Sequence, residues 1–296
     1  MLVSIVTPSY QQARFIERTL ESVARQEGDV EHIVMDGGST DGTVAILERW
    51  RDRITFSSGR DGGQTAAINA GIARARGDVF AYLNSDDVYY EGAVAAAVEA
   101  FERDPSADVV YGEAVHIDAD DHIIGAYATE PWSMERLKLV CFLCQPAVFF
   151  RRRVIERFGP FDARLDYCMD YEYWLRLGMR GARFVHIPAR LAASRVHDET
   201  KTRSRPREVH TEINNMLREH LGRVPDNWLW NYAHTVLDAR GIERSSDLTY
   251  LLRAALLTAM AAFRWSRFPS MPLIRNTGSW FVHGSPFVTR RVERDA

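Results

Sequence analysis

The chain has 296 residues, of which 46% are hydrophobic and 26% charged, enough for one large globular domain or a domain with an appendage. Its formal net charge of -3 argues against general nucleic-acid binding, which usually depends on a basic domain. Cys141, Cys144 and Cys168 are too few, and odd in number, for a disulfide framework, and they favour a reducing, cytoplasmic compartment.

The first part of the chain alternates between short apolar strands and helices. Residues 2–7 form a β-branched run that stops at Pro8, and they predict a buried strand; the segment lacks the basic leader and long apolar core of a signal peptide. A helix at 65–76 is expected to close on Gly77 in the C′ position. Further strands are expected at 32–35, 54–57, 79–83 and 109–111, and further helices at 13–26, 43–50 and 92–103. This order predicts an α/β fold with a mostly parallel sheet and helices on both faces.

The pattern changes after residue 112. Residues 116–127 predict two strands around a polar turn, Asp118-Ala119-Asp120-Asp121, which has no calcium-loop pattern after it. A strand is expected at 147–150, helices at 153–158 and 170–180, and a strand at 183–187 that ends at Pro188. From about Pro206 the sequence is mainly helical, so we expect a domain at 1–205 and a helical extension at 206–296.

Acidic side chains follow two of the expected strands. Asp36 comes after the strand at 32–35, and Asp86 and Asp87 come after the strand at 79–83. Open α/β sheets bind ligands beyond the carboxyl ends of their strands. Carboxylate oxygens suit hard divalent cations, and such a cation can hold a diphosphate. These positions predict a nucleotide-sugar site.

Several motifs in combination resemble the family 2 glycosyltransferases, which have the GT-A fold. The resemblance covers about residues 2–200 and implies an inverting transfer of a sugar from a nucleoside diphosphate, with UDP as first choice, to a hydroxyl acceptor. It also divides the first domain into a nucleotide-binding half, about 1–112, and an acceptor half, about 113–205. Its setting would be the assembly of a cell-surface polysaccharide or glycolipid. The matching segments are 4–10, 36–43, Gly63, 69–71, 75–78, 83–87, 145–152, 158–162 and 170–177.

By this resemblance, Asp36 contacts the nucleotide base, and Gly37 and Gly38 let the backbone approach it. A second interpretation is that Asp36 caps the turn that follows it. The other residues expected along the same crevice are Thr7, Pro8, Tyr10, Asp61 and Asn69.

Asn84-Ser85-Asp86-Asp87 stands where the family has its DxD motif, with Asn in place of the first acid. Mg²⁺ or Mn²⁺ needs only one or two carboxylates when phosphate oxygens complete its shell. We expect Asp86 or Asp87 to ligate the metal, and the other to contact ribose or a metal-bound water. A solvated turn or helix cap is the alternative. Beyond the last expected strand, His197 is a candidate for the diphosphate or metal, and Arg195 and Lys201 for diphosphate neutralisation.

Asp170 is the expected general base, which accepts the proton of the acceptor hydroxyl. The family motif often has Glu-Asp here, and Met169 replaces the Glu, so Glu172 is the fallback base. The alternative is that Asp170 caps a helix. Arg176 is expected to be structural.

Other functions have weaker support in the sequence. A nucleotidyltransferase needs a glycine-rich, basic loop after the first strand, and residues 7–12 are neither. A non-catalytic sugar-nucleotide-binding or scaffold protein stays open because of Asn84 and Met169. For the extension, packing on the first domain, dimerisation and peripheral contact with the inner face of a membrane are all open, the last through a helix at 254–268. Arg151, Arg152 and Arg153 are expected on a solvated helix start, and the cysteines in the core.

Overall fold

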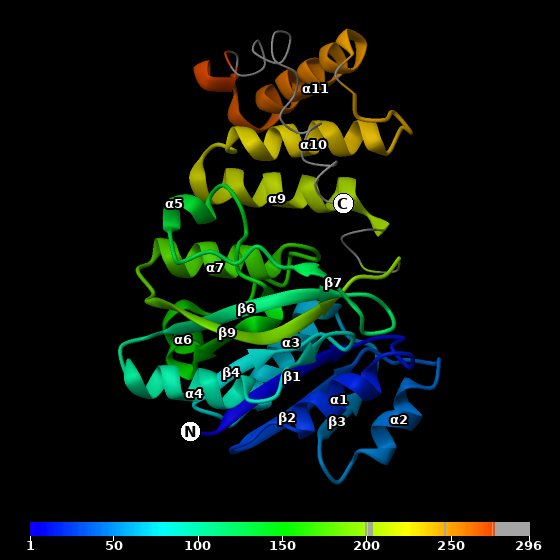
Figure 1. Ribbon diagram of the computed structural model, residues 1–296, viewed down its shortest axis with the longest axis vertical. Helices are drawn as coiled ribbons and strands as arrows, with labels where there is room; N and C mark the ends of the chain where they lie inside the picture. Colours follow the sequence, from blue (N-terminus) through cyan, green and yellow to red (C-terminus); the bar gives the residue numbers. More distant parts are fainter. Residues whose placement is uncertain (199, 201–203, 246, 274, 276–296) are drawn as a thin grey trace. The chain divides into compact units, whose positions relative to one another are not determined.

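The computed structural model describes residues 1–198, 200, 204–245, 247–273 and 275 (Figure 1). The chain divides into two compact units, residues 1–198 and 199–296. The first unit is an α/β structure, and the described part of the second is helical.

One mixed sheet forms the frame of the first unit. Its strands are β1 (Val3–Ser9), β2 (Val30–Asp36), β3 (Thr55–Ser58), β4 (Val79–Tyr82), β5 (Val88–Tyr89), β6 (Val109–Ile117), β7 (Ile123–Ala126), β8 (Val148–Arg151) and β9 (Phe184–Arg195). They lie in the order β3-β2-β1-β4-β8-β6-β9-β5, with β7 paired to β6. Strands β3, β2, β1 and β4 run parallel, β8 is antiparallel to both of its neighbours, and β9 runs parallel to β6. The predicted α/β class is confirmed.

Helices cover both faces of this sheet. The helices are α1 (Ile16–Ala24), α2 (Thr43–Arg49), α3 (Gln64–Arg74), α4 (Ala93–Arg103), α5 (Met134–Leu137), α6 (Arg152–Phe158) and α7 (Met169–Met179), with a 3-10 turn η1 at Gln145–Ala147. Because side chains alternate along a strand, Ile5 of β1 packs in the cluster that includes α1 and α4, whereas Val6 faces α3. On the α3 face, Trp174 of α7 packs against Phe150 of β8.

Gly77 is required for a reason other than the predicted helix cap. Helix α3 ends at Arg74, and Gly77 does not adopt the left-handed conformation of a C′ residue. A Cβ atom on Gly77 would lie 2.6 Å from the Oγ atom and 2.7 Å from the backbone nitrogen of Ser4. The prediction of a C′ cap was wrong, and the glycine is needed for close approach to β1.

Strand β9 does not stop at Pro188, as predicted, but continues to Arg195. Its pairing with β6 jumps from Gly112↔Ile187 to Glu113↔Arg190, so Pro188 lies in a bulge. A proline is tolerated there because it needs no ladder hydrogen bond. The extra length brings Arg195 beside the loop that joins β4 to β5.

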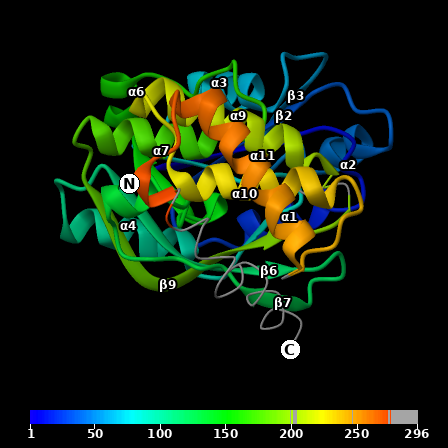
Figure 2. The ribbon, with the colours of Figure 1, turned by 90° about the horizontal axis from the view of Figure 1, so that it is seen from above.

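The second unit contains α9 (Pro206–Leu221), α10 (Asp226–Asp238) and α11 (Leu248–Ser266). Helix α10 packs against both of the others, and α11 crosses it obliquely (Figure 2). The Nε1 atom of Trp265 on α11 donates to Oδ1 of Asn215 on α9 at 2.8 Å. The helical C-terminal region is therefore confirmed, and among the described helices none has the length and apolar character to cross a membrane.

Candidate active site

Asp36 ends β2 and organises the loop that follows it. Its Oδ2 atom accepts hydrogen bonds from the backbone nitrogens of Gly38, at 3.0 Å, and Ser39, at 2.9 Å, and from the hydroxyl of Ser58 at 2.5 Å. Its Oδ1 atom accepts one from the hydroxyl of Ser39 at 2.5 Å. The side chain is buried. Asp36 thus caps the turn, which was the second interpretation of this residue, and one of its oxygens still has acceptor capacity.

Tyr10 and Asp61 meet beside this loop. A Cβ atom on Gly37 would lie 3.2 Å from Oδ2 of Asp61 and 3.3 Å from Cδ2 of Tyr10, so glycine leaves room for both side chains. Tyr10 and Asp61 are exposed, and Oδ1 of Asp61 accepts from the backbone nitrogen of Gly63 at 2.8 Å. An aromatic face and a carboxylate therefore lie next to the Asp36 loop.

Three other residues expected along the crevice have structural contacts. Thr7 and Pro8 are buried within β1, and Oγ1 of Thr7 lies 2.9 Å from Nε2 of His32. Asn69 of α3 uses both ends of its amide on the backbone of Phe161, at 2.8 and 3.0 Å. Asn69 therefore holds the segment between α6 and α7 in place.

Asp86 and His197 come together beyond the end of β4. Nε2 of His197 lies 3.1 Å from Oδ2 of Asp86, with the two side chains 9% and 17% exposed. The ring of His197 packs against Phe15 at 4.9 Å between centroids. Within the described residues, Oδ1 of Asp86 accepts no hydrogen bond. Asp86 therefore has a carboxylate oxygen that a cation could reach, and His197 is hydrogen-bonded beside it.

Asp87 has a different environment from its neighbour. It is buried, Oδ1 accepts from the backbone nitrogen of Arg195 at 2.7 Å, and Oδ2 accepts from Nδ2 of Asn84 at 3.2 Å. Burial, followed by the negative charge of Asp86, raises the pKa of Asp87. Asp87 therefore fastens its loop to β9, and Asp86 is the aspartate that remains available.

A hard divalent cation fits this donor set in part. Asp86 and His197 would supply two ligands, and phosphate oxygens and water are the usual source of the rest. In the described residues, no group of three or more His, Cys, Asp or Glu side chains is arranged to hold a metal ion by itself. The residues present therefore suit a cation that arrives with a diphosphate.

The buried side chain of Arg195 stabilises the Asp86 loop through hydrogen bonds. Its side chain is fully buried, Nε donates to the backbone oxygen of Asp86 at 2.7 Å, and Nη1 donates to that of Asp118 at 2.8 Å. Nη2 lies 2.5 Å from Oδ1 of Asp121. Its predicted role on the diphosphate gains no support from these contacts, which join the Asp86 loop to the turn between β6 and β7. Lys201, the other cation predicted there, lies outside the described residues.

Asp170 is the second residue of α7 and is half-buried. The N-cap of this helix is Cys168, so Asp170 lies in the first turn, where a negative charge is favourable. Burial, then the charges of Asp170 and Asp87, raise the pKa of Tyr82. The negative charges of both carboxylates disfavour ionisation of the Tyr82 phenol, so both lie near the end of β4.

Glu172, the fallback base, is engaged with Arg176. Nε of Arg176 donates to Oε1 of Glu172 at 2.7 Å, and Nη2 donates to Oε2 at 3.1 Å. Arg176 also donates to the backbone oxygens of Phe158 and Pro160. Both side chains are largely buried. The structural role predicted for Arg176 is confirmed.

The sequence reasoning missed two glutamines that surround Asn84. Nε2 of Gln64 donates to Oδ1 of Asn84 at 2.8 Å, and Nδ2 of Asn84 lies 3.2 Å from Oε1 of Gln145. Gln145 in turn donates to the backbone oxygen of Tyr82 at 2.6 Å. An aspartate at 84 could not donate to Asp87, which explains the amide there. The segment 145–152, which matches the family and begins with Gln145, was the signal that pointed to this residue without giving it a role.

Comparison with known proteins identifies the family. A profile described as "Glycosyl transferase family 2" matches residues 4–159, more than half of the chain. The chain belongs to this family. The PGL/p-HBAD biosynthesis glycosyltransferase of Mycobacterium bovis (strain BCG / Pasteur 1173P2) is 31% identical over 196 residues, which cover 63% of this chain and 74% of that protein. The predicted assignment to the glycosyltransferases, and hence to the transferases, is confirmed.

Two solved structures of glycosyltransferases share the fold. S. aureus TarS 1-349 in complex with UDP-GlcNAc has a TM-score of 0.65 and 14% identity, covering 96% of this chain and 93% of that one. The mannosyltransferase PcManGT from Pyrobaculum calidifontis, in complex with GDP-Man and Mn2+, has a TM-score of 0.61 and 18% identity, covering 99% and 84%. At these identities the likeness concerns the fold, and it confirms the predicted GT-A class.

Proposed function

We propose that this family 2 glycosyltransferase is inverting and metal-dependent, and that it moves a sugar from a nucleoside diphosphate to a hydroxyl acceptor. The pairing of Asp86 with His197 carries the proposal, because it places a carboxylate and an imidazole 3.1 Å apart beyond the end of β4. A bound Mg²⁺ or Mn²⁺ would neutralise the diphosphate as it leaves. The complex of PcManGT with GDP-Man and Mn2+ supports a metal in a protein of this fold.

The nucleotide in this proposal lies at the ends of β1 and β2. Oδ1 of Asp36 accepts one hydrogen bond and retains capacity for the N–H of a base such as uracil. The exposed ring of Tyr10 offers a stacking face, and Asp61 offers further acceptors beside Gly37. Thr7 and Pro8 shape the crevice through the backbone, and Asn69 is left out because Phe161 occupies its amide. UDP is the first choice of nucleotide, and GDP and dTDP are the alternatives.

Asp170 is the proposed general base. The acceptor hydroxyl transfers its proton to the Asp170 carboxylate while its oxygen bonds to the anomeric carbon, and the bond from that carbon to the diphosphate breaks on the opposite face. Asp170 lies in the first turn of α7 and is partly accessible to solvent, so an acceptor hydroxyl can reach its carboxylate. Glu172 is already neutralised by Arg176, which makes it a poor base.

The donor site is tested by thermal unfolding with UDP, GDP, dTDP or CMP, each with and without Mn²⁺. A ligand at about 100 times its Kd stabilises the native state by about 2.7 kcal/mol. We expect one nucleotide to stabilise the protein only with metal, and we expect the effect to disappear in Asp86→Asn. The matched control is Asp120→Asn, the same change at an exposed turn.

Turnover is then followed as release of the free nucleotide from the sugar donors of that nucleotide, with the anomer of the product determined by NMR. An inverted anomer is expected. Binding without turnover in the presence of any sugar donor would favour the scaffold alternative, and a retained anomer would contradict the role of Asp170. Absence of stabilisation by all four nucleotides would contradict the donor site itself.

For the acceptor, we extend the proposal to the assembly of a cell-surface polysaccharide or glycolipid, the setting that the family resemblance implied. Lipid-linked and free glycan acceptors compared in the same assay would separate the two.

A further inference from the structure

Helix α11, orange in Figure 1, has a row of large apolar side chains that are exposed to solvent. The side chains are four, four, four and three residues apart, so they lie along one side of a helix with about 3.6 residues per turn. Their exposed fractions run from 53% to 63%. They are Leu248, Leu252, Leu256, Met260 and Phe263, and we call them the α11 stripe.

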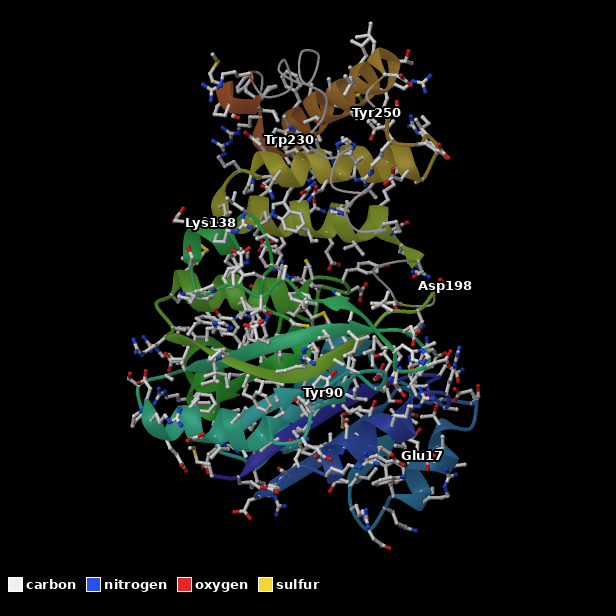
Figure 3. All side chains as sticks on the ribbon, viewed as in Figure 1. Glu17, Tyr90, Lys138, Asp198, Trp230 and Tyr250 are labelled. Carbon is white, nitrogen blue, oxygen red and sulfur yellow. The ribbon has the colours of Figure 1, made fainter. Side chains whose placement is uncertain are left out.

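The other side of α11 is anchored to its own unit. The hydroxyl of Tyr250 lies 2.5 Å from Nδ1 of His234 on α10, and the indole of Trp265 donates to Asn215 on α9. Figure 3 shows Tyr250 on α11 and Trp230 on the neighbouring α10. Because hydrogen bonds hold both ends of the helix, the exposure of the stripe does not come from a detached helix.

Exposed apolar side chains are concentrated in this part of the chain. Of the twelve large hydrophobic residues that are exposed among the described residues, seven lie in 248–271: the α11 stripe, Phe268 and Met271. Helix α9 instead exposes polar side chains, namely Arg207, Glu208, Asn215, Arg218 and Glu219. A helix that is apolar on all sides normally has a partner on each side, and a concentrated apolar surface marks an interaction site.

Apart from Asp247 at the N-cap of α11, the charged residues on this helix and directly after it are arginines. From residue 248 to 275 the sequence contains four arginines and no acidic residue. Arg253 and Arg264 are exposed and eleven residues apart, about three turns, so they lie along the same edge of the stripe. Arg267, also exposed, follows at the end of the helix. This surface is complementary to a partner that is apolar inside and negatively charged at its border.

We propose that the α11 stripe, with Phe268 and Met271, inserts into the interfacial layer of an anionic lipid bilayer. The apolar side chains would enter the boundary between headgroups and acyl chains, and Arg253, Arg264 and Arg267 would remain among the anionic headgroups. The inference depends on the second unit alone and does not require the proposed sugar transfer.

A second copy of the chain fits this surface less well. In a two-fold dimer the same patch meets itself, and Arg253 and Arg264 would border a surface that contains arginines and no carboxylate within 248–275. Like charges at such a border are unfavourable. An anionic bilayer satisfies the apolar stripe and the arginines together.

The test is flotation of the full-length protein with phosphatidylcholine vesicles, with and without phosphatidylglycerol. We expect binding that requires phosphatidylglycerol and weakens with salt. Leu256→Gln/Phe263→Gln should lower the vesicle affinity at least about tenfold, because two apolar side chains no longer enter the layer. Arg253→Gln/Arg264→Gln should lower it about fivefold for each arginine.

The matched control is Ile123→Gln/Ile124→Gln, since these two β7 side chains are 57% and 56% exposed. It should bind vesicles as the natural protein does. All variants should keep their melting temperatures, because the changes are at exposed positions. Failure of the natural protein to float with anionic vesicles would overturn the proposal, as would equal loss in the β7 control. A dimer in sedimentation equilibrium that only the stripe variant dissociates would assign the surface to a second copy.

Discussion

In residues 1–198, Arg151 and Arg152 donate to backbone oxygens of Ala107, Phe101, Gly77 and Ala75, whereas in the second unit Arg253 and Arg264 lie exposed beside an apolar stripe. The solvated position expected for Arg151 and Arg152 was therefore wrong. An arginine has five donors on a flexible stem, so it can close a loop against carbonyl groups as readily as it can face an anionic surface. The surrounding backbone decides between these uses.

The two units also differ in the side chains that they present. In the first unit, hydrogen bonds join Gln64, Asn84, Asp87 and Arg195 into one network beside the carboxylate of Asp86. The described part of the second unit has most of the large exposed apolar side chains. We therefore expect chemistry to depend on the first unit and surface attachment on the second.

Of the substitutions, Asp170→Asn should have the largest effect on activity. That effect should be limited to the chemistry of the first unit. Loss of the proposed base should lower kcat by about 10² to 10⁴, while the Kd of the nucleotide with Mn²⁺ and the affinity for vesicles stay unchanged. Steady-state kinetics, calorimetric titration and flotation measure the three quantities. An unchanged kcat would remove Asp170 from the mechanism.

Arg195→Met and Arg264→Met compare the two uses of arginine directly. Arg195→Met should lower the free energy of unfolding by about 3 kcal/mol, because the backbone oxygens of Asp86 and Asp118 lose a buried partner. It should also weaken metal-dependent nucleotide binding, since the Asp86 loop loses its support. Arg264→Met should change stability by no more than about 1 kcal/mol, because Arg264 is exposed and loses only its stacking on the Trp265 ring. Equal losses of stability for the two variants in urea unfolding would contradict the distinction between a structural and a surface arginine.

Glu172→Gln tests a buried ion pair next to the proposed base. The change leaves Arg176 without a charged partner and should cost about 2 kcal/mol of stability. At a temperature where the variant is folded, kcat should stay within a few-fold of the natural value. A loss of kcat as large as that of Asp170→Asn, at unchanged stability, would make Glu172 the base.

The last comparison is a pH dependence of stability that both units share. Burial lowers the pKa of His32 in the first unit to about 3 and that of His234 in the second to about 4. A histidine in the unfolded state has a pKa of about 6.5. Below that pH the unfolded state binds more protons than the folded state, so stability falls. Each histidine should contribute up to about 1.4 kcal/mol per pH unit until its folded pKa is reached.

Urea unfolding of the natural protein, His32→Gln and His234→Gln between about pH 6.5 and pH 4.5 measures this slope. Each variant should show a flatter dependence on pH than the natural protein. If the units unfold in separate transitions, each substitution should flatten only its own. Slopes that match the natural protein would show that neither histidine is responsible.

Much of the site's position was predictable from local pattern. The apolar runs at 32–35 and 79–83 predicted strands, and the structure has Asp36 at the end of β2 and Asp86 just beyond β4. The difference between Asp86 and Asp87 was not predictable. It depends on the backbone nitrogen of Arg195, 108 residues away, which approaches Asp87 only because β9 passes through the bulge at Pro188.

By itself, the sequence determined the α/β class, the family and the strand ends at which the acidic residues stand, because apolar periodicity and short motifs are local properties of the chain. Only the tertiary structure decided which aspartate stays accessible, which arginines are buried, why Gly77 has no side chain and which face of α11 is left uncovered. Those outcomes depend on hydrogen-bond partners and packing surfaces from distant segments, and a linear pattern does not specify which distant groups will meet.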